Sequence, residues 1–420
     1  MNRHAYLTVG IMFLVLAAPL SSATGIPAKK VSWRADKKGL LSKDFMLPAP
    51  SGTQEDCPCS DASLCKPIDV AYEVETFGFG ATNFKDGEGF NWDAITTVAW
   101  GSGIDLICDA HFHGVRVIAS VSPPLTSDQD LISQFVSDTL ASVQENFYDG
   151  VTFDWESPVD GYDDPMNSYY LDVVTQTTKA LKELNPSYQV SVCAAWSPNG
   201  IDGRYYDYKG LADATDYLYV MCYDTRSQIF DQCIASANAP ISICQKGISD
   251  YLQIKVPAEK LILGVPWYGY KYECIDPEFN PEVGKTCEIS QVPFRGVNCS
   301  DAAGSEVAYA NIRSIVNEGR NSSEVMRDTY MNVPFFNYQD DGKNYQIWYD
   351  DPESLSAIYK WAVESGLGGT GPYRWDQLDA SNEAESSEMW DAIAVVGSKK
   401  TVVESFKESP SKNIEVLDFH

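Results

Sequence analysis

Eight short apolar segments recur along the chain after residue 68, and helical segments separate most of them. Strands that are apolar on both faces and alternate with helices form parallel sheets that helices cover on both sides. Eight such units predict an α/β fold, a closed (β/α)8 TIM barrel. The predicted strands are Val74–Gly80, Ile95–Trp100, Val115–Val121, Gly150–Glu156, Gln189–Trp196, Tyr217–Tyr223, Leu261–Tyr268 and Gly368–Trp375, and two of the predicted helices are Leu131–Phe147 and Tyr169–Leu184.

The interval between the seventh and eighth predicted strands is too long for one helix. Residues 271–349 contain three cysteines and several short aromatic runs, so we expect a small α+β insertion there. A helix pattern resumes at Asp350-Asp351-Pro352-Glu353, where an acidic cap and an early proline mark a helix N-terminus.

The N-terminal residues have the pattern of a secretory signal peptide. Arg3 and His4 precede an apolar run from Tyr6 to Leu20, and small residues follow at the cleavage spacing. This run is too short for a membrane anchor, so we expect a soluble chain in the secretory pathway. The predicted organisation is a signal peptide (1–23), a flexible leader (24–54), the barrel (55–395) and a flexible C-terminal tail (396–420).

The charge balance restricts the class of partner. A formal net charge of −28 and a pI near 4.4 argue against nucleic acid and anionic membrane surfaces. Asn298 and Asn321 each begin a glycosylation sequon, which is meaningful in a secreted chain. We expect a monomer.

Eleven cysteines in a secreted chain indicate disulfides and at least one thiol left over. Cys193 and Cys222 lie inside apolar strand segments, so we expect both to be buried free thiols. With only four histidines and no Cys-x-x-Cys pair, we expect no metal site, and nothing indicates another cofactor.

The fourth predicted strand carries two carboxylates near its end. Alternate side chains of a strand share a face, so Asp154 and Glu156 should point the same way while Phe153 and Trp155 pack on the other side. Two like charges held close do not both ionise readily, so one carboxyl should keep its proton to a higher pH, as a general acid must. The alternative is a pair of solvated strand-end acids.

Aromatic and polar residues also gather at the ends of the later strands, where a (β/α)8 barrel places its active groups. Rings stack on sugar faces while carboxylates and phenols bond hydroxyl groups, so this set predicts a carbohydrate pocket, although any one ring could instead pack in the core. The residues concerned are Trp196, Met221, Tyr223, Asp224, Trp267, Tyr268 and Trp375.

The acidic strand resembles the Asp-x-x-Asp-x-Asp-x-Glu motif of glycoside hydrolase family 18. Asp149, Thr152, Asp154 and Glu156 occupy its four slots, and Thr152 departs from the usual Asp. Met221-Cys222-Tyr223-Asp224 matches the Met-x-Tyr-Asp element. Longer segments between Cys57 and Trp390 resemble the lysosomal, chitobiose-cleaving branch of the family: Ala195–Pro198, Ala237–Pro240, Gly264–Tyr270, Val292–Gly296, Cys299–Gly304 and Gln346–Asp350.

This resemblance implies roles for individual residues. Glu156 would be the general acid and base, Asp154 would orient the acetamido group of the substrate, and Tyr223 would position its oxygen. Asp149, of opposite strand parity to Glu156, would be a structural acid supporting Asp154. Trp375 is preferred over Tyr373 as the floor of the pocket.

Two residues of the insertion, Arg295 and Asp301, could bond sugar hydroxyls, or could equally form ordinary surface ion pairs. The resemblance implies a lysosomal exoglycosidase, with secretion as the alternative, that acts on β-1,4-linked N-acetylglucosamine in the chitobiose core of asparagine-linked oligosaccharides. It would release the reducing-end sugar. A chitinase on longer oligomers and a non-catalytic chitinase-like lectin are the alternatives.

Overall fold

A computed structural model of the chain describes residues 57–80, 89–226 and 232–397. The predicted signal peptide and leader, together with nearly all of the predicted tail, lie outside the described residues.

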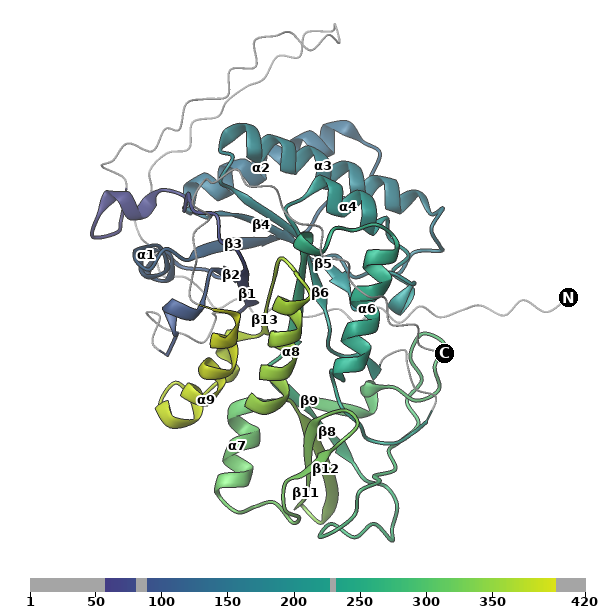
Figure 1. The fold of residues 1–420 in the computed structure, drawn as a ribbon. Coiled ribbons are helices and arrows are strands. Elements are labelled where there is room, and N and C mark those ends of the chain that lie inside the picture. Colours follow the sequence, from purple (N-terminus) through teal and green to yellow (C-terminus); the bar gives the residue numbers. More distant parts are fainter. Residues whose placement is uncertain (1–56, 81–88, 227–231, 398–420) are drawn as a thin grey trace, which may run out of the picture. The chain divides into compact units, whose positions relative to one another are not determined.

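Eight parallel strands close into a barrel in the order β1-β13-β7-β6-β5-β4-β3-β2, so the predicted fold class is confirmed. Their bounds agree with the predicted segments to within a few residues (Figure 1). The strands are β1 (Glu75–Phe79), β2 (Thr97–Ala99), β3 (Arg116–Val121), β4 (Gly150–Phe153), β5 (Gln189–Ala195), β6 (Tyr217–Met221), β7 (Leu261–Pro266) and β13 (Gly369–Tyr373).

Helices follow most of the barrel strands and cover the outside of the wall (Figure 1). The α-helices of the barrel are α1 (Ile104–Phe112), α2 (Gln129–Glu145), α3 (Pro165–Leu184), α4 (Tyr208–Ala214), α6 (Ile241–Gln253), α8 (Pro352–Glu364) and α9 (Glu383–Ile393). Short 3-10 helices are η2 (Ala62–Cys65), η3 (Trp92–Ala94), η4 (Ile201–Gly203), η5 (Ala258–Lys260), η6 (Asp301–Ala303), η7 (Trp375–Gln377) and η8 (Ala394–Val396).

The helix starts follow from local sequence. Asp164 caps α3 by accepting from the backbone N–H of Met166, and Pro165 occupies the first turn, where no N–H is needed. Asp351 and Ser354 form a reciprocal capping box at the start of α8, at the position that the sequence predicted.

The predicted insertion is a lobe built on a five-stranded antiparallel sheet in the order β10-β11-β12-β8-β9. It begins at Tyr268, three residues earlier than predicted, because β7 ends at Pro266 and Tyr268 opens the first strand of the lobe. Its elements are β8 (Tyr268–Glu273), β9 (Gly304–Ala308), α7 (Tyr309–Asn317), β10 (Met326–Asp328), β11 (Val333–Asp340) and β12 (Lys343–Tyr349).

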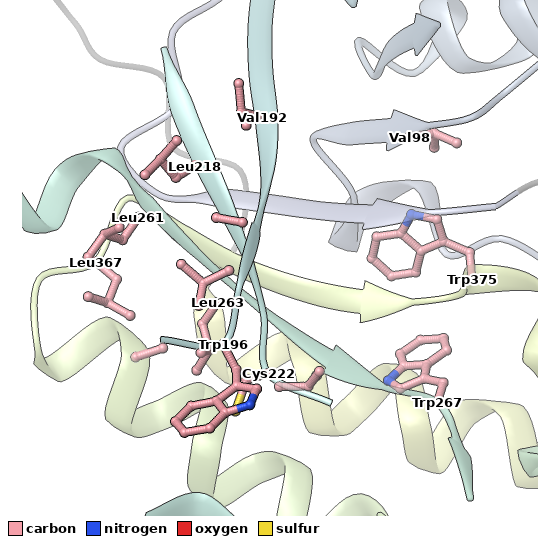
Figure 2. Packing of buried hydrophobic residues seen from close by; sticks show 14 of the residues in the cluster. Val98, Val192, Trp196, Leu218, Cys222, Leu261, Leu263, Trp267, Leu367 and Trp375 are labelled. Atoms are coloured by element: carbon pink, nitrogen blue, oxygen red, sulfur yellow. The ribbon is translucent and has the colours of Figure 1, made fainter. Parts of the chain in front are cut away.

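Buried apolar side chains form two clusters. The outer cluster lies between the barrel wall and the helices and continues into the lobe at α7, β11 and β12, and the inner cluster lies inside the barrel and in the rest of the lobe. Figure 2 shows part of the outer cluster, including Leu218, Leu263 and Trp267. Inside the barrel, the ring of Tyr219 lies against Gly264, where an added Cβ would come within 2.4 Å of it. A residue larger than glycine at position 264 would therefore displace the central aromatic ring of the barrel.

Ten of the eleven cysteines form five disulfides: Cys57–Cys65, Cys59–Cys108, Cys222–Cys244, Cys233–Cys299 and Cys274–Cys287. Cys193 is a buried free thiol, as predicted. The same prediction for Cys222 was wrong. Cys222 lies just beyond β6 and faces outward to α6, where Cys244 is its partner. No helix among the described residues is long and apolar enough to cross a membrane.

Candidate active site

Asp154 and Glu156 lie just beyond the carboxyl end of β4 and line one cavity of about 230 Å³. Phe153 is fully buried outside the wall, and Trp155 stacks on Tyr206 with ring centroids 4.6 Å apart. The predicted division of this segment into an acidic face and a packed face is therefore present. The other residues that line the cavity are Phe79, Trp100, Cys193, Met221, Tyr223, Asp224, Glu306 and Tyr373.

The carboxyl group of Asp154 is largely removed from solvent. Its burial, reinforced by the charge of Glu156, raises the pKa of Asp154 to about 6. Its Oδ1 atom is buried and has no hydrogen-bond partner among the described residues. Asp154 therefore places a carboxyl group in the wall of the cavity, and this group keeps its proton closer to neutral pH than a free aspartate does.

Glu156 is held differently, because 52% of its side chain is exposed. Its Oε2 atom accepts a hydrogen bond from Nη1 of Arg204 at 2.5 Å. The Arg204 side chain is only 7% exposed, and its Nη2 atom donates to Oδ2 of Asp202 at 2.8 Å. A buried guanidinium therefore fixes one oxygen of the more exposed carboxylate.

Tyrosines form an aromatic wall around the cavity. The ring of Tyr223 stacks on Tyr373 at 5.2 Å between centroids and meets Tyr268 edge-on at 6.2 Å. Tyr268 donates to Oδ1 of Asp224 at 2.7 Å, and burial raises the pKa of Asp224 to about 7. Burial also raises the pKa of Tyr223 well above its usual value of 10, so its hydroxyl keeps its proton and can donate.

Three tryptophans predicted to bind substrate lie elsewhere. Trp375 and Trp267 are fully buried in the outer cluster, with ring centroids 5.4 Å apart (Figure 2). Trp196 is 7% exposed in the same cluster, where its backbone carbonyl lies against Gly247 of α6. Trp196 and Trp267 continue the outward-facing positions of Ala194 and Val265 two residues earlier in the chain. Trp375 begins a helical turn.

The preference for Trp375 as the pocket floor is therefore corrected. Its ring covers the outer side of β1 at Gly78, where an added Cβ would lie 2.5 Å from it. Tyr373, the last residue of β13, lines the cavity instead. Of the predicted sugar contacts, Met221 and Asp224 line the cavity, and Tyr268 lies directly behind it.

Asp149 is a buried structural acid, but it lies at the opposite end of β4 from Asp154. Its Oδ1 atom accepts from the backbone N–H of Ile68, and its Oδ2 atom accepts from that of Val117, each at 2.7 Å. Nε2 of His111 lies 2.8 Å from Oδ2. Asp149 therefore fastens the segment before β1 to the barrel, and the expectation that it supports Asp154 is corrected.

The predicted residues of the insertion are not among those that line the cavity. Arg295 donates from Nη1 to the backbone carbonyl of Asp202. Asp301 is 8% exposed, and its burial raises its pKa to about 6. Asn298 is exposed in a loop, whereas the side-chain amide of Asn321 donates to the backbone carbonyl of Ser323 at 2.7 Å.

Sequence reasoning missed five residues of the site, one of which, Cys193, was predicted only as a buried thiol. Trp100 and Phe79 end predicted strands, and counting inward-facing positions would have found them. Arg204 and Glu306 have no such signal, because one follows η4 and the other lies on β9 of the lobe. Among the described residues, the one group with metal-ligand spacing is Cys57, Cys59 and Cys65, and each of these sulfurs is in a disulfide.

A (β/α)8 barrel whose fourth strand ends in two carboxylates above a cavity walled by tyrosines has the architecture of a glycoside hydrolase. The family model for glycosyl hydrolases family 18 matches residues 116–377. The chain belongs to this family and is a glycoside hydrolase.

Within the family, the chain is similar to di-N-acetylchitobiases. It is 38% identical over 349 residues to probable di-N-acetylchitobiase 2 of Dictyostelium discoideum, covering 80% of this chain and 90% of that protein. It is also 38% identical over 351 residues to di-N-acetylchitobiase of Rattus norvegicus, covering 81% and 93%. A class V chitinase from Nicotiana tobaccum, solved in complex with NAG4, shares the fold with a TM-score of 0.59 at 14% identity over 77% of this chain and 99% of the other.

Proposed function

We propose that this glycoside hydrolase cleaves the β-1,4 bond between two N-acetylglucosamine units in the chitobiose core of asparagine-linked oligosaccharides and releases the reducing-end sugar. The names of the relatives support the substrate class. The observation that carries the proposal is the pairing, in one cavity, of Glu156 with an Asp154 whose buried Oδ1 atom has no partner among the described residues.

The proposed reaction retains the anomeric configuration without a carboxylate nucleophile, an exception to the usual scheme of two carboxylates. Glu156 gives its proton to the glycosidic oxygen as the bond from that oxygen to the anomeric carbon breaks. The acetamido oxygen of the same sugar attacks the anomeric carbon and forms an oxazolinium ion. Glu156, now a carboxylate, then removes a proton from the water that opens this ion.

Asp154 and Tyr223 hold the acetamido group in this scheme. Asp154 lines the cavity and accepts from the acetamido N–H, and the fraction of it that is ionised, which grows as the pH approaches and passes its pKa of about 6, stabilises the positive charge that develops on the oxazolinium. The Tyr223 hydroxyl, protonated at all physiological pH values, donates to the acetamido oxygen and orients it for attack.

The size of the cavity favours a short substrate. Ligand pockets usually measure roughly 300–1,000 Å³, and the described residues enclose about 230 Å³ around the two carboxylates. This space suits one sugar ring, with the leaving sugar at the mouth beside Glu156. A chitinase acting along longer chains would need an extended groove.

We also place the protein in lysosomes, reached through the secretory pathway. The N-terminal pattern of a signal peptide supports entry into that pathway. The net charge of −28 suits an acidic lumen, because protonation of carboxylates there relieves their mutual repulsion.

Two experiments test the proposal. Glu156→Gln should abolish hydrolysis of the disaccharide while the protein still binds it, because an amide cannot donate the required proton; normal turnover would remove Glu156 as the acid. Product analysis on reducing-end-labelled chitotriose then separates the candidate functions. Release of the labelled single sugar supports the proposal, internal cleavage indicates a chitinase, and binding without cleavage indicates a lectin.

A further inference from the structure

We propose that Arg204 is a positioning residue for the general acid: it occupies Oε2 of Glu156 and thereby assigns the transferred proton to Oε1. This inference rests on the proposed function, since it concerns how Glu156 delivers its proton. It concerns a residue outside the acidic motif and outside the set of cavity-lining side chains.

The first support is the chemistry of the guanidinium group. Arginine carries donors only and no acceptor, so it cannot receive a hydrogen bond from a protonated carboxyl oxygen. Nη1 of Arg204 lies 2.5 Å from Oε2 of Glu156. A proton on Oε2 would face this N–H directly, so the neutral form of Glu156 has to carry its proton on Oε1.

The second support is that Arg204 itself is held rigidly. Its side chain is 7% exposed, and its Nη2 atom donates to the Asp202 carboxylate at 2.8 Å. Tyr206 and Tyr208 lie near enough to interact electrostatically with the guanidinium group. Arg295 of the lobe donates to the backbone carbonyl of Asp202. The guanidinium therefore keeps one position while the more exposed Glu156 is aligned against it.

The third support is that other contacts hold the backbone of the Glu156 segment, so Arg204 acts on the carboxyl group and is not needed for the fold of that segment. Val159 donates its backbone N–H to Gly203 at 2.9 Å. Tyr206 stacks on Trp155 and donates its hydroxyl to the backbone carbonyl of Ser157 at 2.5 Å. None of these contacts uses the Arg204 side chain, so we expect them to persist when that side chain is shortened or replaced.

What remains for Arg204 is the orientation of a side chain that is 52% exposed. A glutamate with this exposure samples several rotamers, and only those that aim Oε1 at the glycosidic oxygen are productive. The nearby charges are those of Asp154 on the cavity side, Asp202 behind the guanidinium and Arg295 of the lobe. The two acids cannot replace the donor that Arg204 supplies to Oε2, and the Nη1 atom of Arg295 donates to the backbone carbonyl of Asp202.

The test compares two substrates that differ in their need for an acid. When the disaccharide is cleaved, its second sugar would leave as a poor alkoxide, so the glycosidic oxygen needs protonation. The 2,4-dinitrophenyl glycoside of N-acetylglucosamine releases a stable phenolate, which needs none. For Arg204→Met, kcat/KM should fall about 100-fold or more on the disaccharide, the scale of general acid catalysis. It should fall less than about 5-fold on the dinitrophenyl glycoside if the acid step alone is lost.

Arg204→Lys keeps a charge and donors, so its ratio of kcat/KM on the disaccharide to kcat/KM on the dinitrophenyl glycoside should lie between those of the original enzyme and Arg204→Met. Asp202→Asn removes the charge that anchors the guanidinium, so it should lower this ratio as well, but less strongly. Asparagine, like aspartate, tolerates the left-handed backbone of residue 202, where φ is 55°. These two variants test the proposal even if Arg204→Met folds poorly.

Tyr206→Phe is the matched control, because it removes a neighbouring hydrogen bond to the same segment without touching the Glu156 carboxyl. In this variant, kcat/KM should change by the same factor on both substrates. Equal losses on both substrates in the Arg204 variants, or no loss on the disaccharide, would overturn the proposal. Glu156→Gln in the same assay tests the proposed function separately: normal disaccharide turnover there would refute Glu156 as the acid, whatever the Arg204 variants show.

Discussion

The phenol rings of Tyr223 and Tyr373 stack across the barrel mouth, with centroids 5.2 Å apart and planes inclined by 25°. They come from strands that are not neighbours in the barrel, since β7 separates β6 from β13. The stack therefore joins two sides of the rim and fixes the direction of the Tyr223 hydroxyl. Burial adds to this by keeping that hydroxyl protonated.

Tyr223→Phe tests the role of this hydroxyl. The ring and its stack on Tyr373 remain, so the fold should be unchanged, but one preorganised donor to the acetamido oxygen is lost. We expect kcat to fall by about 100-fold, the scale for removing a single donor that stabilises a transition state. Steady-state kinetics on the disaccharide checks this. A kcat within twofold of the original enzyme would exclude a role for the hydroxyl in the attack.

Tyr373 and Trp375 provide a paired test of the pocket floor. Tyr373→Ala removes an aromatic wall of the cavity and should lower kcat/KM by about 10-fold, the equivalent of one aromatic contact. Trp375→Phe leaves the cavity intact but opens space between Trp267 and Trp390, so it should destabilise the fold by roughly 1–3 kcal/mol at unchanged kcat/KM.

Urea unfolding and kinetics on both proteins separate these effects. If Trp375→Phe weakened substrate binding while stability stayed constant, Trp375 would have to face the sugar, against its complete burial.

The sequence predicted the architecture well because barrel strands carry a strong local signal. The predicted eighth strand, for example, differs from β13 by one residue at its start and two at its end. It predicted Asp154 and Glu156 together because strand alternation continues past the last ladder hydrogen bond. It could not predict which side of the wall Trp196, Trp267 and Trp375 occupy, since one position of register reverses the face of a ring.

Contacts between distant segments were also beyond the sequence. Arg204 meets Glu156 across 48 positions of the chain, and no local pattern distinguishes this buried arginine from one on the surface. Likewise, the partner of Cys222 is on a helix, where spacing alone does not indicate a disulfide. Such pairs are decided by how the elements pack and cannot be read from the composition of either segment.

Asp154 should make the folded protein less stable at neutral pH. Burial raises the pKa of Asp154 to about 6, whereas an aspartate of the unfolded chain keeps its ordinary pKa of 3.8, so the folded state resists ionisation. Asp154→Asn removes this cost. Below pH 4 both states are protonated and the variant should match the original protein; as pH rises from 4 to 6 the variant should become more stable, by on the order of 3 kcal/mol at pH 7.

Urea unfolding at pH 4, 5.5 and 7 measures this difference, and the pH 4 result serves as the internal control. The same variant should lose activity by about 100-fold or more, because an amide cannot stabilise the developing positive charge. If the difference in stability between the variant and the original protein were the same at all three pH values, Asp154 would ionise as easily in the folded protein as in the unfolded chain.

Asp149→Asn should destabilise the fold without affecting the chemistry. Asp149 is fully buried and accepts from two backbone N–H groups and from His111, and an amide in its place leaves one of these donors without an acceptor. We expect a loss of about 1–3 kcal/mol. The kcat at 25 °C should stay unchanged, because Asp149 and Asp154 lie at opposite ends of β4, five positions apart in the chain, which corresponds to roughly 16 Å in a strand.

The destabilisation should also depend on pH in a defined direction. Burial by itself lowers the pKa of His111, but the hydrogen bond and charge of Asp149 outweigh it, and the pKa is raised overall. The stability from this pair is therefore fully present below the unfolded pKa of about 6.5 and is lost as pH rises through the folded value. Asp149→Asn should cost more at pH 5.5 than at pH 9. A lower kcat with unchanged stability would instead tie Asp149 to the catalytic end of β4.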